Sequence, residues 1–181
     1  MKRMLLYYGG IGAAIMIGVN LLVLLITGIP DAEDFAMGEV IGYSTIVAAL
    51  AIPIYLGVRE YRDKMSEGSI SFGKAWLVGL VITELPALAF AAYNLLYVKV
   101  IDPDFTQKYM EYQTELARAS MTAEEFQAFE ATMGAQSPLL TNIAFQTVVM
   151  YVTVLLIGIG ISLLLAIFLR RKAQSEEGAL T

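Results

Sequence analysis

Four long apolar runs dominate the pattern of hydrophobic and polar positions along the chain. They cover about residues 4–28, 40–58, 75–98 and 145–169. A helix needs about 20 mainly apolar residues, each adding about 1.5 Å, to cross the hydrocarbon core of a bilayer. The pattern therefore predicts an all-α fold, in which a bundle of four transmembrane helices makes a single membrane domain of residues 1–181.

The polar segment between the third and fourth runs, about residues 99–138, has the periodicity of short helices. Thr122 and Glu125 have the spacing of a capping box, which predicts a helix start, and Gly134 is expected to end that helix. A preceding helix is indicated by an apolar stripe of Phe105, Tyr109, Tyr112 and Leu116. We expect a helical hairpin that acts as a lid or docking surface, or that simply packs on the membrane domain or the lipid.

Basic residues are distributed unevenly between the two sides of the predicted bundle. Lys and Arg are retained on the cytoplasmic side of a membrane. Nine of these residues fall on the side of the two termini and three on the side of the hairpin: Lys2, Arg3, Arg59, Arg62, Lys64, Lys74, Arg170, Arg171 and Lys172 against Lys99, Lys108 and Arg118. We therefore expect cytoplasmic termini and an extracytoplasmic hairpin.

Composition narrows the range of chemistry. Hydrophobic residues make up 57% of the 181 residues, above the value of about 45–50% in soluble domains. The net charge of -5 argues against a nucleic-acid binder. Because the chain contains neither cysteine nor histidine, disulfides, thiolate nucleophiles, imidazole bases and His/Cys metal sites are excluded. We expect no enzyme activity, no cofactor and no metal, and a lipid bilayer as the surroundings.

Small residues recur four apart on three of the predicted helices. In lipid, such stripes mark places where two helix backbones approach closely, within one chain or between copies. The third helix has the longest stripe and is expected at the centre of the bundle. The stripes are Gly10, Ala14 and Gly18; Ala75, Gly79, Thr83, Ala87 and Ala91; and Gly158, Ser162 and Ala166.

Glu84 lies near the middle of the third apolar run, where an ionised carboxylate is costly. Pro86, two residues later, leaves the carbonyl of Ile82 without its helical donor. Ala87 and Ala91 share nearly the same helix face, so we expect Glu84 to point toward a packed neighbour. It either exchanges a proton or binds a cation with help from that carbonyl, or it stays protonated and holds neighbouring groups together by a hydrogen bond.

Polar residues also fall toward the hairpin side of the apolar runs. They are Asn20, Ser44, Thr45, Asn94, Asn142 and Gln146. Together with Glu84 they could line a polar vestibule. Equally, helix ends tolerate amides and hydroxyls without any such vestibule.

Two short motifs flank the loop before the third run. Residues 57–64 read Gly-Val-Arg-Glu-Tyr-Arg-Asp-Lys, and residues 70–75 read Ile-Ser-Phe-Gly-Lys-Ala. On these motifs the chain resembles a family of four-helix membrane proteins of unknown function found in Bacteroidota. The resemblance implies a bacterial inner membrane and supplies no catalytic residue. Arg59, Arg62 and Lys64 are expected to contact lipid phosphates or to dock a partner.

Three functional hypotheses remain. The first is a non-enzymatic accessory or scaffold subunit, which binds a membrane-protein partner or forms a homo-oligomer through its small-residue stripes and hairpin. The second is a small transporter or channel that uses Glu84 as its proton or cation site. The third, weaker hypothesis is a membrane enzyme that uses the acidic residues of the hairpin side.

Overall fold

A computed structural model describes residues 1–171 of the chain, and Lys172 lies outside the described residues. Over this range the chain forms six α-helices and no β-strand, so the all-α prediction is confirmed. In chain order the elements are α1 (Lys2–Thr27), η1 (Ala32–Asp34), α2 (Phe35–Met65), α3 (Phe72–Leu96), η2 (Tyr97–Ile101), α4 (Phe105–Ser120), α5 (Ala123–Leu140) and α6 (Ile143–Leu169). The short element η1 is a 3-10 helix, and η2 is a π-helix.

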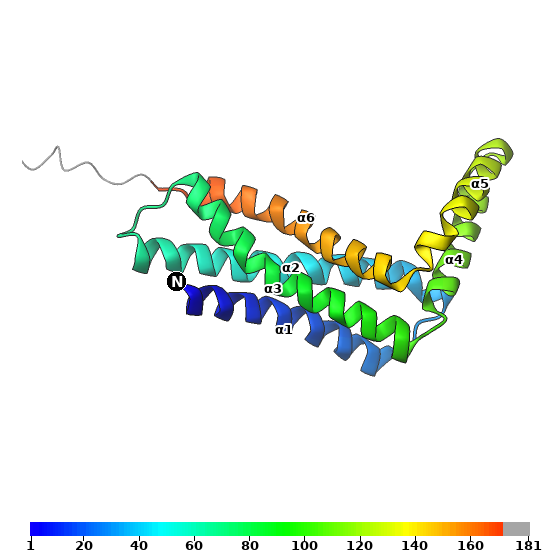
Figure 1. The fold of residues 1–181 in the computed structure, drawn as a ribbon, viewed down its shortest axis with the longest axis horizontal. Coiled ribbons are helices and arrows are strands. Elements are labelled where there is room, and N and C mark those ends of the chain that lie inside the picture. The colour runs from blue at the N-terminus through cyan, green and yellow to red at the C-terminus, as the bar shows by residue number, and fades with distance from the viewer. Residues whose placement is uncertain (172–181) are drawn as a thin grey trace, which may run out of the picture.

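Four of these helices, α1, α2, α3 and α6, form an elongated bundle (Figure 1). Each is long and apolar enough to cross a membrane, as predicted. Large apolar side chains face outward on them, for example Leu25 of α1 with 82% of its surface exposed and Phe168 of α6 with 80% exposed. Such a surface suits hydrocarbon and is unusual for a soluble monomer.

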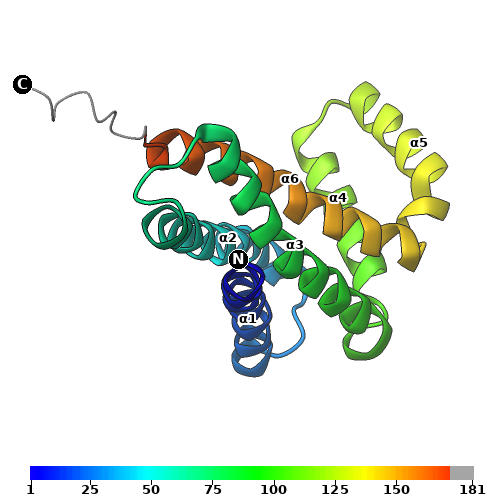
Figure 2. The same cartoon turned by 60° about the vertical axis from the view of Figure 1, so that its left-hand side comes forward.

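The two ends of the bundle differ in what they carry (Figure 2). One end carries α4 and α5, which project from it as a hairpin. The other end, here called the basic end, carries Met1, the α2–α3 loop and the last residues of α6. All the predicted terminal-side basic residues up to Arg171 belong to this basic end or its adjoining helix turns.

The helix α2 is longer at both ends than its apolar run. It begins at Phe35 and continues to Met65 through the charged motif. Ion pairs four residues apart, from Arg59 to Asp63 at 3.6 Å and from Lys64 to Glu60 at 3.3 Å, support the helix beyond the apolar segment.

The hairpin has two helices, and the capping box at the start of the second is present. The Thr122 hydroxyl accepts from the Glu125 amide, and the Glu125 carboxylate accepts from the Thr122 amide. The expected stop at Gly134 is wrong, because α5 continues through it to Leu140. A single glycine costs a helix only about 1 kcal/mol, and at the far end the Gln146 side chain donates to the freed carbonyl of Leu140 at 2.6 Å.

The helix α3 lies at the centre of the bundle and packs against α1, α2 and α6. Its residues Ala75, Gly79, Thr83, Ala87 and Ala91 are all buried. Small residues four apart let its backbone approach its neighbours closely, which explains why this helix could take the central place.

Candidate functional site

Glu84 is the central residue of α3, and its side chain is exposed on the surface of the bundle. The exposed residues before and after it on α3 are apolar, with Val81 43% and Leu88 55% exposed. The expected direction, toward a packed neighbour, is therefore not found. Ala87 and Ala91 are buried, whereas Glu84 belongs to the exposed stripe that also contains Leu77.

One hydrogen bond reaches the Glu84 carboxylate within the described part of the chain. The hydroxyl of Tyr151, on α6, donates to its Oε2 atom at 2.7 Å. Sequence reasoning missed Tyr151. The available signal was a polar tyrosine well inside the fourth apolar run, away from the interfacial belts where tyrosines usually lie.

The contact between α3 and α6 explains why these two side chains meet. Gly158 lies against the side chain of Thr83, the residue just before Glu84. One turn away, a Cβ added to Gly79 would lie 2.6 Å from the Ser162 Oγ atom. This close approach of the two backbones brings Tyr151 within reach of Glu84.

The proline break in α3 faces a different helix. A Cβ added to Gly9 of α1 would lie 3.3 Å from the Ile82 carbonyl oxygen, and one added to Gly12 would lie 2.7 Å from the Pro86 ring. Both groups thus pack on α1, whereas Glu84 is paired with α6. The structure does not bring the freed carbonyl and the carboxylate together into one ion site.

The small-residue stripe expected on α1 also faces away from the bundle. Ala14 and Gly18 are exposed and Gly10 is half-buried. A Cβ added to Gly10 or Gly18 would meet no described atom within 4 Å. Within this chain, α1 packs instead through Gly9 and Gly12, which are buried.

The charged motif at the basic end makes contacts inside the chain. Gly57 is packed against the side chains of Ile82 and Tyr8. The Tyr8 hydroxyl donates to Glu60 at 2.6 Å, and Lys74 lies 5.8 Å from the centre of the Tyr61 ring. The motif therefore joins α1, α2 and α3 at this end.

The three basic residues singled out in this motif differ in exposure. The side chain of Arg62 is 17% exposed and donates to Asp63 at 2.7 Å. Those of Arg59 and Lys64 are 56% and 71% exposed. Arg59 and Lys64 can therefore reach a lipid phosphate or another molecule, while Arg62 is held within the chain.

A short antiparallel bridge closes the basic end. The backbone amides of Ile70 and Arg171 donate to one another's carbonyl oxygens, both at 2.9 Å. It fastens Arg171, the second residue after α6, to the loop before α3. Side-chain motifs did not reveal this contact, because it is made by backbone groups alone.

At the hairpin end, α4 is docked on the bundle by aromatic packing. Phe35, the first residue of α2, is buried, with its ring centre 5.7 Å from those of Phe105 and Tyr109. The Tyr109 hydroxyl donates to Glu39 at 2.6 Å. Burial first, and then this hydrogen bond, raise the pKa of Tyr109 to about 12.

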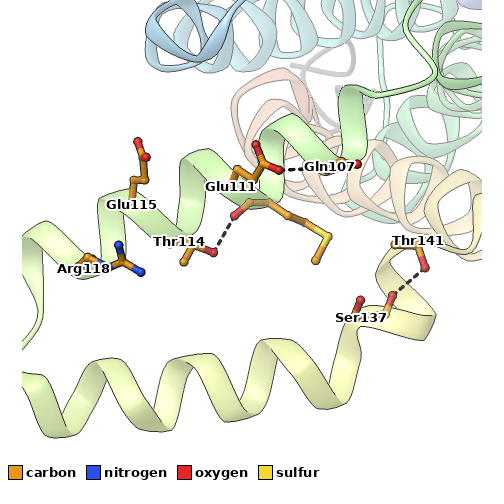
Figure 3. Close-up of a pocket in the computed structure, with 8 residues that line it drawn as sticks. Gln107, Glu111, Thr114, Glu115, Arg118, Ser137 and Thr141 are labelled. Carbon is orange, nitrogen blue, oxygen red and sulfur yellow. Dashed lines mark hydrogen bonds between the residues drawn. The ribbon is translucent and has the colours of Figure 1, made fainter.

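An open cleft of about 580 Å³ separates α4 from α5 (Figure 3). Seven of its eight lining residues are of polar or charged type, among them Thr114 and Arg118 on α4 and Ser137 on α5. The Arg118 guanidinium lies 5.1 Å from the centre of the Phe126 ring of α5. None of the residues of α5 is buried, so this helix is held less firmly than α4.

Most of the vestibule candidates are engaged locally. The Asn20 amide donates to the Met16 carbonyl at 2.7 Å, and the Thr45 hydroxyl to the Ile41 carbonyl at 2.7 Å. Asn142 caps α6 by accepting from the Phe145 amide at 3.1 Å. Each of these contacts is made within one helix or at its cap. No cluster of three acidic residues placed to hold a metal ion occurs in the part of the chain that the structure describes.

The fold and this surface define an all-helical protein with four membrane-like apolar helices and an outward-facing acid, Glu84, at the middle of one of them. The sequence-family comparison confirms one part of the resemblance, a family of unknown function. The chain belongs to a family described as proteins of unknown function, DUF4199, whose model matches residues 7–171. No curated protein and no solved structure matches the chain.

Proposed function

We propose that the chain is a non-enzymatic accessory or scaffold subunit of a complex in a bacterial inner membrane. Its termini lie in the cytoplasm and its hairpin on the extracytoplasmic side. The nine-to-three distribution of Lys and Arg supports this orientation. The absence of cysteine and histidine from the sequence supports a role without catalysis.

The position of Glu84 is the observation that carries this proposal. An ionised side chain at the middle of a membrane helix costs about 2.5–3.5 kcal/mol on insertion scales. A single hydrogen bond such as that from Tyr151 returns about 0.6 kcal/mol, and at most about 1.7 kcal/mol. A second protein covering this face of α3 would remove the remaining cost, so we assign the partner surface to the exposed stripe around Glu84.

The same geometry argues against the transporter hypothesis. Glu84 lies on the outside of the bundle rather than in a cavity, and the freed carbonyl of Ile82 faces α1. A transported ion would have one carboxylate and one phenol as ligands, fewer than cations such as Ca²⁺ or Mg²⁺ require.

Gentle extraction of the tagged full chain tests the proposal. We expect a membrane protein to copurify at fixed stoichiometry, to be lost with Val81→Trp, and to be retained with Leu25→Trp, which adds the same bulk to the exposed face of α1. A chain that extracts alone from native membranes would overturn the proposal. Cation or proton flux in liposomes that Glu84→Gln abolishes would establish the transporter instead.

The orientation has its own test, because the chain contains no native cysteine. A cysteine placed at Ser66, after the last residue of α2, should react only with reagents that reach the cytoplasm. Labelling of this cysteine from the outside of intact cells would reverse the assignment.

A further inference from the structure

The carboxylate of Glu84 has acceptor capacity that the chain does not use. A carboxylate offers two oxygens and about four lone-pair positions. Tyr151 occupies one position on Oε2, and no other described residue donates to the group. The exposed residues beside it, Val81 and Leu88, have no donor. A partner that covers this face therefore meets an unfilled acceptor at the centre of an apolar stripe.

The Lys and Arg side chains of the described residues belong to positions far along the helices from Glu84. The closest before Glu84 is Lys74 of α3, ten residues away. The closest after it is Lys99 of η2, fifteen residues away. At about 1.5 Å per residue these distances are roughly 15 Å and 22 Å along the helix axis. The other nine Lys and Arg of residues 1–171 lie at helix ends, in the hairpin or directly after α6.

A second copy of the chain is consequently a poor occupant of this face. In the same bilayer orientation, residues 1–171 of that copy offer no cation at the depth of Glu84. A two-fold axis through the face would bring two Glu84 carboxylates together, and like charges disfavour such a pairing. The side-chain amide of Asn20 already donates to the Met16 carbonyl. The Asn94 nitrogen is buried without a hydrogen-bond partner among residues 1–171, but it lies ten residues from Glu84, near the end of α3.

From this charge complementarity we infer that the partner is a different protein, whose transmembrane helix places a Lys or Arg near its middle, opposite Glu84. Ionisable residues inside membranes pair with one another, because each neutralises the other in a medium that solvates neither. Tyr151 holds the carboxylate in position for that contact. The inference rests on the proposed function, since it specifies the partner of the same surface.

Synthetic transmembrane peptides test this chemistry directly. The full chain, with a donor dye on a cysteine introduced at Ser66, is reconstituted in liposomes with acceptor-labelled Leu/Ala peptides. These have an apolar core of about 20 residues and carry Lys, Gln, Leu or Glu at the central position. We expect energy transfer to show the Lys peptide binding about 3- to 30-fold more tightly than the Leu peptide, with Gln between them and Glu weakest.

Two variants of the protein show whether Glu84 is the group that binds the central side chain of the peptide. Glu84→Gln should abolish the preference for Lys over Gln, because the amide that it introduces can hydrogen-bond to either side chain but carries no charge. Glu130→Gln, which removes an exposed acid from α5, should leave the preference intact. Thermal unfolding of each variant in detergent confirms that it is folded before the comparison is made.

Three outcomes would overturn the inference: no preference for Lys, a preference that persists in Glu84→Gln, or self-association of two protein copies that requires Glu84. Its failure differs from that of the proposed function. A copurifying partner combined with no Lys preference would remove the inference alone. A Lys preference combined with a chain that extracts alone would remove the accessory role alone.

Discussion

The two faces of α3 are built from the same helix and have opposite properties. On the buried face, Gly79 and Thr83 lie against Ser162 and Gly158 of α6 with no room for another atom. On the exposed face, no helix of residues 1–171 covers Glu84 and its apolar neighbours. The difference separates the residues that hold the bundle together from those available to a partner, although both sets include polar groups.

The hairpin repeats this contrast on a smaller scale. The helix α4 is docked by its aromatic residues and by the bond from Tyr109 to Glu39. The helix α5, in comparison, has no buried residue and faces α4 across an open cleft. The changes below test how sharp the division between docked and open surfaces is, beginning with the largest expected effect.

Gly158→Ala should destabilise the bundle by about 1–3 kcal/mol. An added Cβ would overlap the side chain of Thr83, which is fully buried and held by its bond to the Gly79 carbonyl at 3.0 Å. Gly160→Ala is the matched control, since on the same helix its Cβ enters open space. Thermal unfolding in detergent measures both, and equal stabilities would show that the α3–α6 contact is looser than described.

Gly12→Ala should cost less, toward the lower part of that range. Its Cβ would lie 2.7 Å from both the Ala49 carbonyl oxygen and the Pro86 ring. However, α1 packs on α2 and α3 only from one side, so it can shift outward. Gly10→Ala is the control on the open face of α1 and should leave unfolding unchanged or slightly raise its temperature. A larger loss of stability in Gly10→Ala than in Gly12→Ala would mean that α1 packs on the bundle through the stripe that contains Gly10.

Tyr109→Phe should weaken the docking of α4 by about 0.5–1.5 kcal/mol, because Glu39 loses its shortest hydrogen bond. The pKa of Tyr109 is raised from 10.0 to about 12, so the folded state keeps a proton that the unfolded state releases. This contribution is complete below pH 10 and is lost as the pH rises from 10 to 12. Unfolding of the parent and Tyr109→Phe across this window should converge. Parallel curves would contradict the assignment.

Tyr151→Phe should have the smallest effect in detergent, about 0.6 kcal/mol. It removes only the hydroxyl that binds Glu84 on the exposed face. A double-mutant cycle with Glu84→Gln measures the coupling, and Tyr43→Phe, an exposed tyrosine on α2, is the control. A loss above about 2 kcal/mol would mean that the pair belongs to the core of the bundle rather than to its open surface.

Much of the fold could be predicted from the sequence because the signals are local. Run length indicated the four apolar helices, and the spacing of Thr122 and Glu125 indicated the start of α5. Gly134 was misinterpreted as a helix end, because a glycine permits a stop without requiring one. The stop depends instead on the Thr141–Asn142 turn, where the caps of α5 and α6 meet.

The candidate site could be predicted only in part. Glu84 was found because an acid in an apolar run is conspicuous in any arrangement of the helices. Its partner Tyr151 and its exposure were not found, because both depend on how α6 lies across α3. That crossing is decided by the contact between Thr83 and Gly158, which are distant in sequence.

By itself, the sequence determined four apolar helices separated by polar segments, the uneven placement of basic residues and an acid in the third helix. Hydropathy and helical periodicity carry this information one helix at a time. Only the tertiary structure decided whether α1 packs on the bundle through Gly9 and Gly12 or through Gly10 and Gly18. It also decided which way Glu84 faces. A helix with small residues on one side and an acid on another can be turned either way, and only packing against its neighbours selects the face that stays open.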